Sequence, residues 1–350
     1  MGKDKVVELW QQQLKESLVS PRQAALRFGV DAAPLERVAE IYPFRVTPHY
    51  FRLLQGPLDP LWKQVIPDPA ELAEDGLPVD PLNEDELSPA PGIVHRYPDR
   101  VLFLVSGACA SYCRFCTRKR RVGRAQVSFS EVLAGIDYIA ATPAVRDVLL
   151  SGGDPLIMSD MVLREILQRL RRIPHVEVIR IGTRIPVTLP ERITEGLCRM
   201  LSSFHPLFIN THFNHPREVT PEAAEACARL AGAGIPLGNQ TVLLRGVNDA
   251  TPVLRDLFLR LLKIRARPYY LHQMDLTRGA GHFRTPLSCG LRIMAELRGT
   301  LSGLAIPTFV VDLPGGKGKI PLLPEYGALR GNQVVLRSPC GEEVVYPDIE

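Results

Sequence analysis

Short apolar runs alternate with amphipathic stretches along most of the chain from about residue 100 onward. Apolar or β-branched runs of four to eight residues predict strands, and apolar residues spaced three and four positions apart predict helices. The expected strands are residues 101–105, 147–151, 177–181, 208–211, 236–243, 269–272 and 308–312. The expected helices are residues 129–141, 161–171, 190–201, 221–233, 252–264 and 286–301. Strands that alternate with helices imply parallel βαβ units, so the predicted fold class is α/β.

The N-terminal part of the chain lacks this alternation. It predicts an extension of helices and irregular segments, with an amphipathic helix over Val6–Ser17 and a second helix beginning at Ser20-Pro21. Residues 67–91 are rich in Pro, Asp and Glu and predict an extended arm. The expected organisation is therefore an extension over 1–95, a partial β/α barrel over 96–305 and a C-terminal segment over 306–350.

Polar residues follow each of the expected strands. They include three cysteines after the first strand, and then Ser151-Gly152-Gly153-Asp154, Arg184, His212, Gln240, Asp275 and Asp312. A β/α barrel forms its active site from loops at the carboxyl ends of many strands, whereas a doubly wound sheet uses two or three. Because every expected strand contributes, the pattern favours a barrel or partial barrel.

Composition adds only broad limits. A chain of 350 residues with 45% apolar content can form one large domain with an ordinary core. The net charge of +4 gives no reason to expect a nucleic-acid partner. The first residues lack the apolar core of a signal peptide, and no stretch reaches the ~20 apolar residues that span a bilayer. The seven cysteines are too few for a disulfide scaffold. A cytoplasmic protein without a membrane partner is expected.

Cys109, Cys113 and Cys116 form a C-x3-C-x2-C motif directly after the first expected strand. Three thiolates can hold three irons of a [4Fe–4S] cluster and leave the fourth iron open to a ligand. A structural zinc site needs four ligands, and no matching pair occurs nearby. The motif resembles that of radical S-adenosylmethionine (SAM) enzymes, in which SAM binds the open iron and is cleaved to a 5′-deoxyadenosyl radical.

Two glycine-containing motifs are less specific by themselves. In Ser151-Gly152-Gly153-Asp154 the glycines let the backbone approach a ligand. Radical SAM proteins have a similar turn that holds the amino group of SAM, and the alternative is a plain turn. Lys319 ends the glycine-rich loop 314–319, which is not a phosphate loop because Ile320 replaces the required Ser or Thr. Lys319 can form an imine with pyridoxal 5′-phosphate (PLP), although the motif alone favours a mobile basic loop.

Charged residues near the expected strand ends suggest a substrate site. Arg118 lies in the basic run 117–121, which indicates either a nucleic-acid patch or an arginine that clamps a carboxylate. Asp275 and Asp312 follow the last two strands, and two carboxylates in one cavity favour a cation between them. Together these residues would accept a substrate with a carboxylate at one end and a positive charge at the other.

The combined motifs resemble the lysine 2,3-aminomutase family from about residue 40 to the end of the sequence. The matching segments are His95–Arg100, Cys109–Arg121, Ser151–Pro155, Asn210–Thr220, Gly238–Gln240, His282–Pro286 and Pro314–Lys319. The resemblance implies that Cys109, Cys113 and Cys116 hold the cluster, and that Lys319 binds PLP covalently. It implies that Arg118 binds the substrate α-carboxylate, and that Asp275 and Asp312 bind the side-chain ammonium. It further implies PLP phosphate contacts from Arg96, Tyr97 and Arg100, and SAM contacts from Ser151, Gly152, Gly153, Asp154, His212 and Gln240.

The resemblance implies an isomerase that converts L-lysine to β-lysine by amino migration. The implied partners are an amino-acid substrate and an electron donor such as flavodoxin or ferredoxin. Alternatives are arginine or ornithine as substrate, modification of elongation factor P, and, in another class, an iron–sulfur module that binds RNA. Lys317 replaces a glycine of the family loop. Ala250 stands where a zinc-ligand cysteine is expected, and a Cys-rich C-terminal extension is missing. We therefore expect no structural zinc, and a homodimer.

Overall fold

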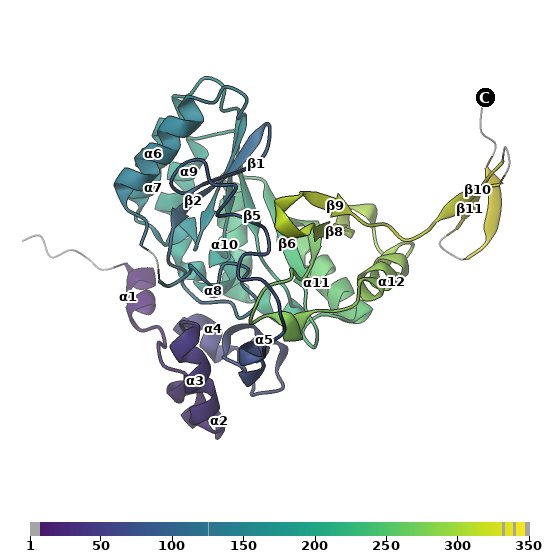
Figure 1. The fold of residues 1–350 in the computed structure, drawn as a ribbon, viewed down its shortest axis with the longest axis horizontal. Helices are drawn as coiled ribbons and strands as arrows, with labels where there is room; N and C mark the ends of the chain where they lie inside the picture. The colour runs from purple at the N-terminus through teal and green to yellow at the C-terminus, as the bar shows by residue number, and fades with distance from the viewer. Residues whose placement is uncertain (1–7, 125, 331–332, 339–340, 347–350) are drawn as a thin grey trace, which may run out of the picture.

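The computed structural model describes residues 8–124, 126–330, 333–338 and 341–346. A curled nine-stranded sheet carries helices on its outer face, and short N-terminal helices pack below it (Figure 1). A separate three-stranded sheet follows near the C-terminus. No helix within the described ranges is long and apolar enough to cross a membrane.

The N-terminal part contains short, well-capped helices. They are α1 Leu9–Lys15, α2 Arg22–Phe28, α3 Ala32–Ile41, α4 Pro48–Arg52, α5 Pro60–Val65 and the 3-10 turn η1 Pro69–Leu72. Side chains of Asp31, Thr47 and Asp59 cap three of these helices by accepting backbone N–H groups. The two predicted helices in this region are confirmed, except that residues 6 and 7 lie outside the described residues.

The predicted parallel strands are all present and pair in chain order. They are β2 Arg100–Ser106, β3 Asp147–Gly152, β4 Val178–Gly182, β5 Leu207–Thr211, β6 Leu237–Leu243, β7 Ala266–Gln273 and β8 Thr308–Asp312. The helices that follow are α6 Phe129–Ala140, α7 Asp160–Arg171, α8 Ile185–Thr188, α9 Glu195–Ser202, α10 Pro221–Gly232, α11 Thr251–Lys263 and α12 Leu287–Leu297. The predicted helix over 190–201 is divided, because the 3-10 turn η3 Pro190–Arg192 precedes α9.

Alternation along the strands separates the core from the cavity. In β3, Val148 and Leu150 are fully buried in the hydrophobic core, while Leu149 and Ser151 line cavities on the concave side. This period of two is expected when one face of a sheet is covered by helices and the other surrounds a site.

Antiparallel strands complete both edges of the curled sheet. β1 Ile93–Tyr97 pairs with β2, and β9 Lys319–Pro321 pairs with β8. The sequence did not predict these strands, because β9 is only three residues long and β1 carries polar residues. The sheet therefore remains open between β1 and β9, and the predicted partial barrel is confirmed.

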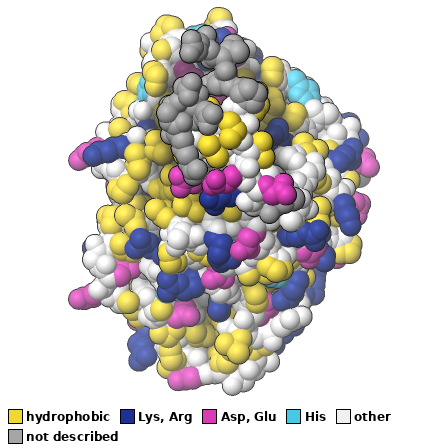
Figure 2. All heavy atoms as spheres, turned by 90° about the vertical axis from the view of Figure 1, so that its right-hand side faces the viewer, with side chains coloured by type: hydrophobic (Ala, Val, Ile, Leu, Met, Phe, Trp, Pro, Cys, Tyr) yellow, Lys and Arg dark blue, Asp and Glu magenta, His cyan; other side chains and the backbone are white. Residues whose placement is uncertain are grey.

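The C-terminal sheet projects away from the rest of the molecule, beyond α12 (Figure 1). It consists of the antiparallel strands β10 Gly327–Arg330, β11 Gln333–Arg337 and β12 Glu343–Tyr346. Figure 2 looks onto this end of the molecule, where acidic and basic side chains are interspersed. This face therefore presents no single-sign field of the kind that attracts a polyanion.

Candidate active site

The three cysteines lie in the loop that follows β2. They line a cavity of about 300 Å³, called here the cysteine cavity, into which the carboxyl ends of several strands open. Glu71 of η1 fixes the loop from below, because its buried carboxylate pairs with Arg114 and with Lys119, each at 2.6 Å. The cysteines thus lie on a segment whose backbone is held by buried charges.

The sulfur atoms lie among hydrogen-bond donors. Arg184 Nη1 donates to Cys113 Sγ at 2.8 Å, and the Arg118 backbone N–H donates to Cys116 Sγ at 3.3 Å. Burial, Asp154 and the two other sulfurs raise the pKa of Cys109 well above its ordinary value. Bound iron would offset this cost, because a metal cation stabilises the thiolate.

No three His, Cys, Asp or Glu side chains in the described part of the chain are close enough together to hold a single metal ion. An iron–sulfur cluster is larger than a single ion and binds each thiolate through a different iron. The C-x3-C-x2-C motif, which places three thiolates in one loop, is the feature that suits such a cluster.

The turn after β3 packs directly against the cysteine loop. A Cβ atom at Gly152 would lie 2.2 Å from Ser106 O, and one at Gly153 would lie 2.1 Å from Ala108 O. The glycines therefore allow two backbone segments to approach each other closely. The Asp154 carboxylate accepts from Thr183 Oγ1 at 2.8 Å and from the Arg184 N–H at 2.7 Å. The N–H groups of Gly153 and Asp154 also donate internally, to Ser106 O and Ala108 O, so the turn offers mainly backbone carbonyl groups to a ligand.

The far wall of the cysteine cavity is polar and neutral. Burial and the Arg184 guanidinium lower the pKa of His212 to about 3, so its imidazole is uncharged. Asn210 Nδ2 is buried without a hydrogen-bond partner, and His272 Nε2 is in the same condition. Buried polar atoms without partners are costly, and a polar ligand in the cavity would satisfy them. The cavity thus fits a ligand such as SAM.

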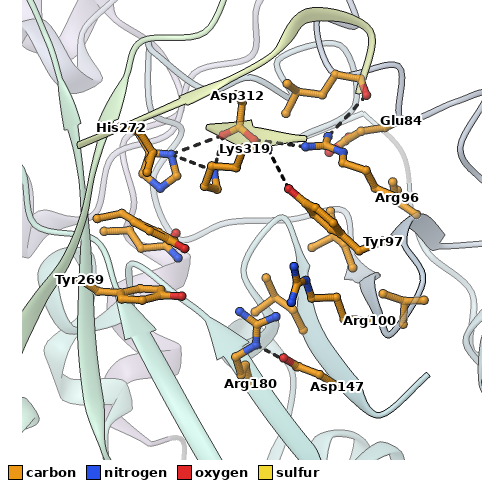
Figure 3. A pocket seen from close by; sticks show the side chains of 18 of the residues that line it. Glu84, Arg96, Tyr97, Arg100, Asp147, Arg180, Tyr269, His272, Asp312 and Lys319 are labelled. Atoms are coloured by element: carbon orange, nitrogen blue, oxygen red, sulfur yellow. Dashed lines mark hydrogen bonds and ion pairs between the residues drawn. The ribbon is translucent and has the colours of Figure 1, made fainter. Parts of the chain in front are cut away.

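A second, larger cavity of about 630 Å³ contains Lys319 and is called here the lysine cavity (Figure 3). Lys319 Nζ forms an ion pair with Asp312 Oδ2 and lies 3.3 Å from His272 Nδ1. Burial raises the pKa of Asp312, but the hydrogen bond from His272 and the Lys319 ammonium outweigh it and lower that pKa overall. The lysine nitrogen is therefore held in a charged and directed position.

Several basic side chains line the lysine cavity together with Lys319. Arg100 stacks over the Tyr97 ring with its guanidinium carbon 4.3 Å from the centroid, and Tyr97 Oη accepts the Lys319 backbone N–H at 2.9 Å. Arg96 pairs with Asp312 at 3.2 Å, and Arg180 pairs with Asp147 at 2.8 Å. Arginines and a tyrosine around one space provide donors for a phosphate group. The lysine cavity therefore fits PLP.

The two cavities share a wall that carries the predicted substrate residues. Arg118, Gln240, His272 and Asp312 line both cavities, and Asp275 lines the cysteine cavity. Burial and the Asp312 carboxylate raise the pKa of Asp275 to about 7. A cation beside Asp275 would relieve this repulsion. A substrate here would meet the Arg118 guanidinium and the carboxylates of Asp275 and Asp312.

The structure gathers every predicted site residue around the two cavities. The cysteine cavity contains Cys109, Cys113, Cys116, Ser151, Gly152, Gly153, Asp154, His212, Gln240, Arg118, Asp275 and Asp312. The lysine cavity contains Arg96, Tyr97, Arg100 and Lys319, together with the residues of the shared wall.

The sequence assigned no role to three further residues of these walls, namely Arg184, His272 and Glu84. Arg184 and His272 could have been found from their positions at strand ends, where active-site residues gather. Glu84 lies in the acidic arm and carries no such signal.

Comparisons with known proteins agree with this geometry. A Radical SAM superfamily family model matches residues 103–257, and a lysine-2,3-aminomutase model matches residues 294–350. An L-lysine 2,3-aminomutase from Fusobacterium nucleatum is 51% identical over 97% of this chain and 82% of its own length. One from Clostridium subterminale is 52% identical over 87% of this chain and 74% of its own length. A glutamate 2,3-aminomutase from Clostridioides difficile is 45% identical over 90% of this chain and 76% of its own length.

The cysteine loop, the curled sheet and the superfamily match together define a radical SAM enzyme. Within that class, the chain belongs to the lysine 2,3-aminomutase family. The family implies a [4Fe–4S] cluster, SAM and PLP as cofactors, and the residues around the two cavities fit all three.

Proposed function

We propose that this protein is an amino-acid 2,3-aminomutase that converts L-lysine to β-lysine. The observation that supports this most directly is the shared wall between the two cavities. It carries Arg118 and Asp312, and Asp275 lies beside it. Side chains of opposite sign in one cavity suit a substrate with a carboxylate and a distal ammonium.

The carboxylates at 275 and 312 favour a cationic side chain over an acidic one. Glutamate would bring a second carboxylate toward Asp275 and Asp312, and like charges in a partly dry cavity repel. Arginine and ornithine carry a distal cation and are secondary candidates. Conversion of lysine to β-lysine for the modification of elongation factor P is a further alternative, and it would use the same site.

In this proposal, Cys109, Cys113 and Cys116 hold the cluster, and the 151–154 turn, His212 and Gln240 surround SAM. Lys319 binds PLP, and Arg96, Tyr97 and Arg100 contact its phosphate. When bound, the cluster and SAM supply a hydrogen-abstracting radical, and PLP supplies electron delocalisation for the migrating amino group.

The chain's own residues then position the reactants and control protons. Asp312 stabilises the Lys319 ammonium, and His272 Nδ1 lies within reach of a proton on Nζ. Arg118 holds the carboxylate end of the substrate, while Asp275 holds its ammonium end. Fixing both ends limits the reacting carbon atoms to a small region between the cavities, and such positioning contributes strongly to catalysis.

Two partners belong to the same proposal. An electron donor such as flavodoxin or ferredoxin would reduce the cluster. The assembly would be a homodimer, which the exposed apolar side chains of the C-terminal sheet support: Leu336, Val344, Val345 and Tyr346 are each more than a third exposed. Apolar residues gathered on a projecting element commonly mark a protein–protein contact.

The test is an anaerobic assay of the reconstituted enzyme with SAM, PLP and dithionite. L-lysine, L-arginine, L-ornithine and L-glutamate are supplied separately, and β-amino products are measured by mass spectrometry. Conversion of L-lysine at the highest kcat/KM is expected. Faster conversion of glutamate, arginine or ornithine would contradict the proposal, as would tight RNA retention without PLP.

A further inference from the structure

The arm that precedes β1 places a carboxylate beside the substrate arginine. Glu84 is 2% exposed and lines the lysine cavity on the same wall as Arg96 (Figure 3). Its Oε1 accepts from Arg118 Nη2 at 2.7 Å, and its Oε2 accepts from Arg118 Nε at 3.0 Å. The two side chains thus form a bidentate pair inside the cavity rather than on the surface.

The geometry of this pair leaves one corner of the guanidinium directed at the site. A guanidinium offers a side edge formed by Nε and Nη2, and an end edge formed by Nη1 and Nη2. Glu84 occupies the side edge. Nη1 lies away from Glu84, and its nearest partner is Ser151 Oγ at 3.5 Å, at the border of the cysteine cavity. Nη1 is therefore the nitrogen that a ligand carboxylate can reach.

The arm itself is fixed, so Glu84 is not free to move aside. Gly315 N, in the loop that leads to Lys319, donates to Pro81 O at 3.0 Å. Arg96 Nη2 approaches Leu82 O at 3.5 Å, and Arg120 lies 3.7 Å from Glu84 Oε2. A carboxylate held in this way can orient Arg118 while the substrate is bound. If Glu84 instead occupied the place of the substrate carboxylate, it would have to move away before the substrate could bind.

We propose that Glu84 is a positioning residue that acts through Arg118. It holds the guanidinium along one edge, so that Nη1 faces the site and can bind the substrate carboxylate. This inference rests on the proposed function, because it assumes that Arg118 binds the carboxylate. Without Glu84, Arg118 keeps its charge but loses the partner that sets its direction.

The experiment measures L-lysine binding without turnover. Enzyme reconstituted with cluster and PLP is titrated with L-lysine while SAM is withheld, and the dissociation constant is read from the change in PLP absorbance. Glu84→Gln is expected to weaken binding about tenfold, since the neutral amide removes the charge of the pair and replaces Oε2, which accepts from Arg118 Nε at 3.0 Å, by an NH2 donor. Glu86→Gln is the matched control, because Glu86 is exposed on the same arm and its carboxylate accepts from the Asn83 side chain.

A double-mutant cycle separates positioning from a general structural effect. In an Arg118→Gln background, Glu84→Gln is expected to change the dissociation constant by less than about twofold, because its effect acts through Arg118. An equal loss in both backgrounds would overturn the inference. So would tighter binding by Glu84→Gln alone, which would identify Glu84 as a competitor of the substrate.

Failure of the underlying proposal gives a different result. If Arg118→Gln alone leaves lysine binding unchanged, the carboxylate role of Arg118 is wrong and the inference falls with it. Cluster absorbance and PLP content of each variant are measured first. A variant that lost either would be replaced by Glu84→Asp, which keeps the charge and is expected to shift Arg118 by shortening its anchor.

Discussion

Most charged side chains at the junction of the cavities are paired, and Asp275 is the exception. Among the described residues it forms no ion pair, while Asp312 pairs with Lys319 and Arg96. Burial and the nearby Asp312 carboxylate raise the pKa of Asp275 to about 7. An unpaired carboxylate with a raised pKa in a cavity is typical of a functional residue.

Replacing Asp275 should therefore damage turnover more than folding. Asp275→Asn is expected to lower kcat/KM for L-lysine by on the order of a hundredfold, because loss of a partner for a buried ammonium costs about 3 kcal/mol. Steady-state kinetics check this, with cluster and PLP content unchanged. Asp256→Asn, on the surface of α11, is the control. Unaltered lysine kinetics in Asp275→Asn would exclude the ammonium role.

The raised pKa of Asp275 also predicts a pH dependence. Because only the ionised carboxylate pairs with an ammonium, lysine affinity should fall as pH decreases below about 7 and level off above it. The test is the dissociation constant of L-lysine, measured without SAM between pH 6 and 9. Below the pKa of Asp275 it should rise about tenfold for each unit by which the pH decreases. If Asp275→Asn shows the same loss of lysine affinity at low pH, a different group causes the pH dependence.

At the residue scale, the sequence predicted the groups that belong to compact motifs. Cys109, Cys113 and Cys116 are recognisable from spacing alone, and Lys319 from its loop once the family resemblance is known. Glu84 was not predictable, because its role depends on a contact with Arg118 across 34 positions. No local pattern records which acidic residue of an arm will meet an arginine of another loop.

At the scale of elements, η1 and the cysteine loop are joined by one buried carboxylate. Glu71 accepts from Arg114 and Lys119, and Lys119 Nζ also donates to Gly279 O at 2.6 Å. Burial, only partly offset by Glu71, lowers the pKa of Lys119 to about 8. Glu71 therefore balances the charge of two buried cations that lie within and just after the cysteine motif.

Removing that compensation should destabilise the whole fold. Glu71→Gln is expected to lower the free energy of unfolding by about 3–5 kcal/mol, since it leaves buried cations without a partner. Urea unfolding followed by circular dichroism measures the change. Glu177→Gln removes the partner of an exposed arginine, Arg146, and should leave the free energy of unfolding almost unchanged. Similar midpoints for the two variants would refute this account.

The sequence predicted elements where periodicity was long enough to observe. The seven parallel strands and the helices between them were found because buried residues alternate or recur regularly. β1 and β9 were missed, since edge strands that face a polar cavity carry polar residues such as Arg96 and Lys319. The division of the chain at residues 95 and 305 stays a prediction.

At the scale of the whole molecule, the projecting C-terminal sheet is the expected site of self-association. Val344 and Val345 of β12 are 53% and 54% exposed. Val345→Asp is expected to weaken the proposed homodimer about tenfold or more, because a charge cannot be buried in an apolar contact. Sedimentation equilibrium measures the effect, and Glu342→Gln serves as a neighbouring control. A wild-type monomer at all concentrations would contradict the dimer.

The curl of the sheet is maintained where its first and last strands face each other. Tyr97 on β1 accepts the Lys319 N–H of β9, and Arg96 on β1 pairs with Asp312 at the end of β8. A molecule that contacts both Arg96 and Lys319 would add a further link between these two edges of the sheet. A ligand that binds only the folded state stabilises that state by mass action. Binding in the lysine cavity would therefore raise the stability of the curled sheet and complete the active site at the same time, and loss of the ligand would reverse both.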